Sequence, residues 1–76
     1  MYNNDNFVCS LGYIDFKGVH AMLRIYKLIS SYEVVIIDDH GFVFYGKLFS
    51  GSYPDNWREA MAHAESLEAV YSRVGK

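Results

Sequence analysis

Apolar residues in the first two thirds of the chain gather in short β-prone runs, whereas those in the last third recur at helical spacing. Short apolar runs that are separated by turn residues are typical of strands. A sustained spacing of three and four residues is typical of an amphipathic helix. We therefore predict an α+β fold in a single domain over residues 1–76: an antiparallel sheet of about four strands, as two serial hairpins over residues 7–49, and one C-terminal helix over residues 53–74.

Two matching tetrapeptides separate the apolar runs. Asp15-Phe16-Lys17-Gly18 and Asp38-Asp39-His40-Gly41 both begin with Asp and end with Gly. The first residue of such a turn accepts hydrogen bonds from the turn amides, and the glycine adopts a positive φ angle. We expect both tetrapeptides to form type I turns that close hairpins, with Ser30-Ser31 joining one hairpin to the next.

Residues 19–29 allow two interpretations. Their β-branched content and the glycine that directly precedes them favour a strand. The helical alternative would give the element order βαββα. It rests on a set of apolar residues that also fall at helical spacing, namely Val19, Met22, Leu23, Tyr26 and Ile29.

The C-terminal segment has the clearest periodicity. Ser52, Pro54 and Asp55 are typical of a helix start, and Gly75 is typical of a helix end. Met61 and Val70 widen the apolar stripe, whose main members are Trp57, Ala60, Ala64, Leu67, Tyr71 and Val74.

Both faces of the second hairpin are predicted to be apolar. Val34 and Ile36 alternate with Val35 and Ile37, and on the next strand Phe42 and Phe44 alternate with Val43, Tyr45 and Phe49. One helix covers one face of a sheet, so the second face needs a twin subunit, another protein or the polar arm of residues 1–6. The alternative is that strong sheet twist hides these residues within the chain.

Composition narrows the function classes. The 76 residues carry 7 Lys+Arg and 9 Asp+Glu, a formal net charge of −2, and 51% of them are hydrophobic. This balance disfavours a general nucleic-acid binder, a mimic of duplex phosphates and a disordered chain. We expect no membrane partner and a cytoplasmic location, because the N-terminal residues lack the pattern of a signal peptide and the single Cys9 cannot form an internal disulfide.

No motif predicts catalysis or a cofactor. We interpret Asp38-Asp39-His40 as turn residues, because adjacent hairpin residues diverge and no further metal ligand lies at a suitable spacing. Glu59 and His63 are four residues apart and are interpreted as a surface pair or as a charge complement to the N-terminal end of the helix. We interpret Cys9 as a small buried apolar residue. We therefore expect a protein that is not an enzyme and that holds no metal or cofactor.

Aromatic and basic residues interleave in Arg24-Ile25-Tyr26-Lys27 and Phe44-Tyr45-Gly46-Lys47. On a sheet, such residues can stack bases and contact phosphates, and this supports single-strand nucleic-acid binding as an alternative function. The seven tyrosines fit a protein interface better, because tyrosine offers a large contact area with a polar tip.

Residues 32–71 resemble the hairpin-then-helix module of HicB-type antitoxins, with Asp38-Asp39-His40-Gly41 at the acidic turn and Glu59-Ala60 in the helix. This resemblance implies toxin neutralisation. In its size and aromatic content, the chain also resembles the small inhibitors of phages and other mobile elements, anti-CRISPR proteins among them. That resemblance implies a protein that blocks host machinery by occupying its surface.

Taken together, the sequence predicts a protein-binding inhibitor or adaptor that blocks a larger host protein or nucleoprotein. An antitoxin-like or nucleic-acid-binding module is the alternative, and a homodimer formed through the sheet is a further possibility. We expect docking through the sheet face opposite the helix and the adjoining turn, with partner contacts from Arg24, Tyr26, Ile37, Asp38, Asp39, His40, Tyr45 and Lys47.

Overall fold

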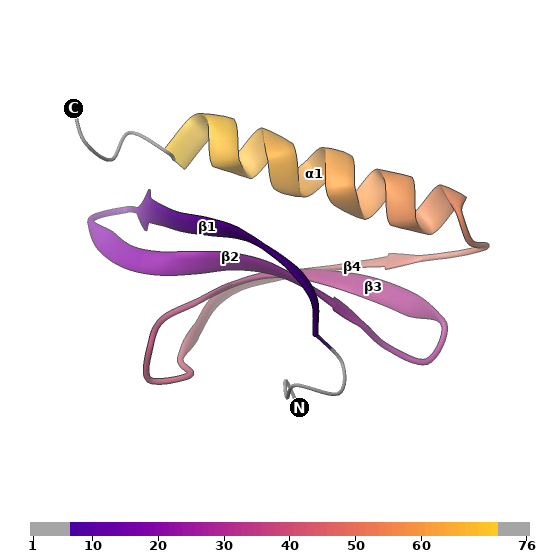
Figure 1. The fold of residues 1–76 in the computed structure, drawn as a ribbon, viewed down its shortest axis with the longest axis horizontal. Coiled ribbons are helices and arrows are strands. Elements are labelled where there is room, and N and C mark those ends of the chain that lie inside the picture. Colours follow the sequence, from indigo (N-terminus) through magenta and orange to yellow (C-terminus); the bar gives the residue numbers. More distant parts are fainter. Residues whose placement is uncertain (1–6, 72–76) are drawn as a thin grey trace.

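The structure is a computed structural model that describes residues 7–71. In chain order its elements are β1 (Phe7–Phe16), β2 (Val19–Lys27), β3 (Ser31–Ile37), β4 (Val43–Ser50) and α1 (Asp55–Tyr71). The strands form one antiparallel sheet in the order β1-β2-β3-β4. Figure 1 shows α1 lying across one face of this twisted sheet. The predicted α+β fold is confirmed, whereas the polar arm of residues 1–6 lies outside the described residues.

Residues 19–27 form a strand, and the helical alternative is wrong. Ala21, Leu23 and Ile25 are buried on the face toward α1, while Met22 and Tyr26 lie on the other face. Because both faces of β2 carry apolar residues, several of these residues also fall three or four positions apart, as they would in a helix. The sequence pattern therefore fitted both interpretations.

The first hairpin turn differs from the predicted type. The loop consists of Lys17 and Gly18 alone, because Phe16 pairs with Val19. Both loop residues have positive φ angles, 54° at Lys17 and 88° at Gly18. Positive φ at both central positions is the geometry of a type I′ turn, whose twist matches that of the flanking strands. Asp15 still accepts a hydrogen bond from the Gly18 amide, at 3.0 Å.

The second turn agrees with the prediction. The Gly41 amide donates to the Asp38 carbonyl at 3.1 Å, and Gly41 has a φ angle of 89°. Asp38 Oδ1 accepts from the amides of His40, at 2.9 Å, and Phe42, at 2.8 Å. The aspartate side chain therefore holds the turn closed, as its position at the start of the tetrapeptide predicted.

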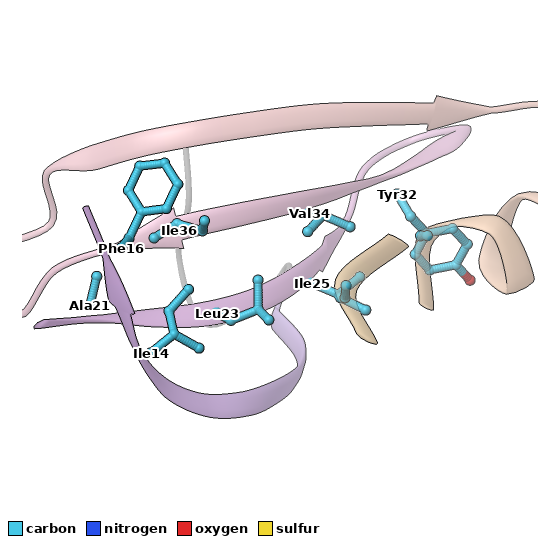
Figure 2. Close-up of a cluster of buried hydrophobic side chains, with 10 residues drawn as sticks. Ile14, Phe16, Ala21, Leu23, Ile25, Tyr32, Val34 and Ile36 are labelled. Carbon is cyan, nitrogen blue, oxygen red and sulfur yellow. The ribbon is translucent and has the colours of Figure 1, made fainter. Parts of the chain in front are cut away.

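The main core lies between the sheet and α1. Figure 2 shows its labelled side chains extending along the sheet, from Ala21 and Phe16 at one end to Tyr32 at the other. Ala60 and Ala64 of α1 are fully buried, and their small side chains allow the helix to approach the sheet closely. The buried sheet residues of this core are Ile14, Phe16, Ala21, Leu23, Ile25, Tyr32, Val34 and Ile36.

The helix begins two residues later than the predicted start at residue 53. It begins at Asp55 and is described to Tyr71, so Val74 lies outside the described residues. Val70 is exposed and does not join the apolar stripe. His63, by contrast, is half-buried and contacts β4. The strand region also extends one residue beyond the predicted limit, to Ser50.

A register irregularity in β4 changes which face its residues occupy. Ile36 pairs with Tyr45 but Ile37 pairs with Val43, so Phe44 is an extra residue on this strand. A bulge of this kind breaks the alternation of side chains between faces. The prediction that Val43, Tyr45 and Phe49 share a face is therefore wrong, because Val43 packs with Ile37 while Tyr45 and Phe49 pack in the main core.

Candidate functional site

The sheet face opposite α1, called the open face below, has an apolar centre of its own. Tyr26, Val35 and Ile37 form a second buried cluster, with Met22 and Val43 packed against it. The prediction that both faces of the sheet are apolar is thus confirmed. Val35 is 0% exposed and Tyr26 is 2% exposed, so this centre is already shielded within the chain.

Arg24 contributes to that shielding by lying across the open face. Its Nε atom is 3.0 Å from the Met22 sulfur, and its Nη1 atom donates to the Tyr26 hydroxyl at 2.9 Å. The guanidinium carbon is 5.0 Å from the centroid of the Phe7 ring. These contacts hold a half-buried cation in a fixed position between apolar and aromatic side chains.

Large apolar side chains are exposed at the rim of the open face. Phe7 is 39% exposed, Tyr13 44% and Leu48 52%. Strand register places all three on this face, because Phe7 pairs with Tyr26, Tyr13 with Met22, and Leu48 with Glu33. The accessible apolar surface therefore lies at the rim of the open face. The main interpretation of the sequence was an uncovered centre, whereas the buried centre agrees with the alternative that these residues are hidden within the chain.

Tyr13 links β1 to the turn between β3 and β4. Its hydroxyl donates to Asp39 Oδ1 at 2.9 Å, and its ring stacks on His20 with centroids 4.4 Å apart. The bond to the Asp39 carboxylate is the main cause that raises the pKa of Tyr13 above its usual value, because it favours the protonated phenol. This contact fixes the turn beside the open face.

The predicted contact residues divide into several groups. Arg24, Tyr26 and Ile37 lie on the open face as predicted, although Tyr26 and Ile37 are buried. Asp38 uses its carboxylate to close the turn, and Asp39 accepts from Tyr13. His40 is exposed at the turn.

Tyr45 and Lys47 do not belong to the open face, and their predicted place in this site is corrected. Tyr45 pairs with Ile36 and Lys47 with Val34, both of which face α1. The sequence-based assignment assumed that side chains alternate between the two faces without interruption from Phe42 onward. The bulge at Phe44 interrupts this alternation, so Tyr45 and Lys47 lie on the face toward α1.

Sequence reasoning missed three residues of the rim, namely Phe7, Tyr13 and Leu48. The sheet face that each residue occupies depends on the pairing register, and the exposure of Phe7 depends also on the position of Arg24. The sequence did contain one signal for this surface, namely the aromatic residues Phe7 and Tyr13 in the first strand. They lie on either side of the register irregularities in β1.

His63 makes a polar contact with the sheet on the side of α1. Its Nε2 atom is 2.6 Å from the Tyr45 hydroxyl, and its ring also lies near Phe49, with centroids 5.4 Å apart. Burial and, next, the charge of Lys47 lower the pKa of His63, because both disfavour the imidazolium. The interpretation of His63 as half of a surface pair with Glu59 is wrong, because its side chain contacts β4.

The described residues offer little for metal or covalent chemistry. Across residues 7–71, no three His, Cys, Asp or Glu side chains come together in a group that could hold a metal ion. Cys9 is half-buried beside the main core, and burial raises the pKa of its thiol, which lowers the fraction of reactive thiolate. In the same part of the chain, no helix has the length and apolarity needed to cross a membrane.

Comparison of the chain with protein-family models, with curated proteins and with solved structures found no significant match.

Proposed function

We propose that this chain is a protein-binding module that acts without catalysis, as a small inhibitor or adaptor. It docks through the open face and blocks a larger host protein or nucleoprotein by occupying its surface, in the manner of phage anti-defence proteins. Blocking of this kind requires complementary area and no catalytic group. The observation that carries the proposal is the set of exposed side chains at the rim of the open face, Phe7, Tyr13 and Leu48, with Arg24 held against Phe7 on the same face.

The chemistry of this surface is that of a protein interface. Interface centres are enriched in aromatic residues, methionine and arginine, and depleted of lysine and glutamate. The open face combines Phe7, Tyr13, Met22 and Arg24, and three contacts of Arg24 hold it in place before binding. A side chain that is already ordered loses less conformational entropy when a partner covers it.

Charge on the open face favours a protein partner over nucleic acid. Among the described residues, Arg24 is the one Lys or Arg side chain that the strand register places on this face. Asp15 and Glu33 share the face, and Asp39 lies beside Tyr13 at its border. Phosphate groups would meet these carboxylates, so direct binding of a single strand is expected to be undetectable even at low salt.

Paired tyrosine variants test the proposal. Tyr13 lies on the rim, whereas Tyr53 is exposed near the Tyr32 ring of the main core and serves as a matched control. The wild-type chain is first used to capture a partner from host extract, and that partner is purified. The affinity of the purified partner for the wild-type chain and for each variant is then measured. Tyr13→Ala should weaken binding about tenfold or more, which corresponds to about 1.4 kcal/mol, and Tyr53→Ala should leave it unchanged. Equal affinities for wild type and Tyr13→Ala would remove the open face as the docking surface.

A further inference from the structure

The outer edge of β4 is able to take up another strand. Among residues 7–71, β4 pairs with β3 alone, because it stands last in the sheet order. A strand in that position presents unpaired peptide N–H and C=O groups along its free side. Those groups can hydrogen-bond to an extended segment from a partner protein.

The geometry of β4 suits strand addition better than that of the opposite edge. β1 has two register irregularities, and Gly12 within it has a φ angle of 101°. Irregularities of this kind disturb the regular spacing that a new strand needs. In β4 the single irregularity lies near its start, and residues 45–50 pair in unbroken register with residues 31–36.

We propose that an extended segment of a partner protein adds to the sheet along β4, placing a carboxylate side chain opposite Lys47 and apolar side chains beside Gly46 and Leu48. This edge site shares Leu48 with the rim of the open face, but it is formed by the backbone of β4 and does not require Phe7 or Tyr13. The two sides of β4 determine the alternation of acidic and apolar residues in the segment.

The side of β4 toward α1 selects the carboxylate. Lys47 is exposed there between Tyr45 and Phe49, with its ammonium 5.5 Å from the Phe49 ring centroid. His63 faces the same side chains from α1, through its contacts with Tyr45 and Phe49. Burial and, next, the charge of Lys47 lower the pKa of His63, and a carboxylate that pairs with Lys47 would oppose the second of these causes.

The other side of β4 selects apolar residues. Gly46 and Leu48 point to the open face, because they pair with Val35 and Glu33. Leu48 is 52% exposed, so an apolar side chain on a new strand could pack against it. Gly46 has no side chain, so a second apolar side chain could extend over it toward Val35, its partner in β3. Cross-strand pairs of this kind are the main source of stability between neighbouring strands.

A second copy of the chain fits this edge less well than an acidic partner. Two-fold pairing of β4 with itself around Gly46 would put the two Lys47 side chains on one face, as diagonal neighbours about 7–8 Å apart. A segment with a carboxylate opposite Lys47 avoids the lysine pair.

The test uses two short blocked peptides of alternating threonine and valine, one with a central glutamate and one with a central lysine. Amide spectra of the whole chain follow each titration. The glutamate peptide should shift the amide resonances of residues 45–50, raise the pKa of His63 and bind about tenfold more tightly than the lysine peptide. Lys47→Gln should remove the preference, whereas Lys17→Gln, in the first hairpin turn, and Tyr13→Ala, on the open face, should retain it.

Three results would overturn the proposal: equal affinities for the two peptides, shifts that map to β1 or to Met22 on β2 and leave residues 45–50 unchanged, or sedimentation showing a dimer whose formation shifts the amide resonances of residues 45–50. Because Tyr13→Ala is expected to leave peptide binding intact, failure of this edge site is distinguishable from failure of the open face.

Discussion

The environment of His63 makes the stability of the chain depend on pH. The imidazole lies between α1 and β4, where burial and Lys47 both lower its pKa relative to the unfolded chain. As pH falls below about 6.5, the unfolded chain therefore binds a proton before the folded chain does. At neutral pH, His63 makes its full contribution to the free energy of unfolding. This contribution decreases as the pH falls from the pKa of the unfolded chain to the lower pKa of the folded chain, and it is lost below that.

Denaturant unfolding at a series of pH values between about 7.5 and 4.5 measures this effect, and the pKa of His63 in the folded state comes from its ring resonances. His63→Gln should reduce the fall in unfolding free energy over this window. An unchanged pH profile in His63→Gln, or a His63 pKa above that of a free histidine, would contradict this account.

Single residues were the least predictable part of the candidate site. Asp38 and Gly41 could be placed because turn chemistry is local and depends on a few adjacent residues. Arg24 was named as a contact, but its position over Phe7 depends on strand pairing, which the sequence does not specify. Tyr45 and Lys47 were assigned to the wrong face for the same reason.

Among the elements, the first hairpin turn contains a conformation that its sequence does not favour. Lys17 adopts a φ angle of 54°, in the left-handed region where a side chain with a Cβ atom is strained. Asn is the residue most compatible with this position of a type I′ turn followed by glycine. Lys17→Asn should therefore raise the unfolding free energy by up to about 1 kcal/mol.

Lys47→Asn is the matched control for this substitution. Lys47 lies within β4 and has no positive φ angle, and asparagine is disfavoured in strands. This variant should gain nothing or lose stability. Thermal or urea unfolding of both variants provides the comparison, and equal effects of the two substitutions would contradict the assignment of strain to Lys17.

The elements themselves could be predicted because hydrophobic spacing is a local property. Four strands and the helix lie close to their predicted limits, and the matched Asp…Gly tetrapeptides located two of the three hairpin turns within residues 7–71. Residues 19–29 allowed two interpretations because β2 has apolar residues on both faces. The alternation of apolar and polar residues that identifies a strand is therefore absent from its sequence. The bulge at Phe44 had no sequence signal, since no glycine or proline marks it.

For the whole molecule, the main physical feature is a sheet that is apolar on both faces but carries its helix on one. The sequence predicted this arrangement, and the two buried clusters confirm it. Shielding of the second cluster within the chain was the alternative interpretation, and the low exposure of Val35 and Tyr26 agrees with it. The position of Arg24 over part of this cluster was not predicted. The surface available to a partner is accordingly the rim around that cluster.

The most direct test of the open face as a docking surface is transfer of magnetisation from a bound partner to the methyl groups of this chain. Met22 and Leu48 lie on the open face, whereas Met61 packs against the main core and Val70 is exposed on α1. In the complex with the captured partner, saturation of the partner should attenuate the methyl signals of Met22 and Leu48 and spare those of Met61 and Val70. Attenuation of Met61 and Val70 with Met22 and Leu48 unaffected would contradict the account.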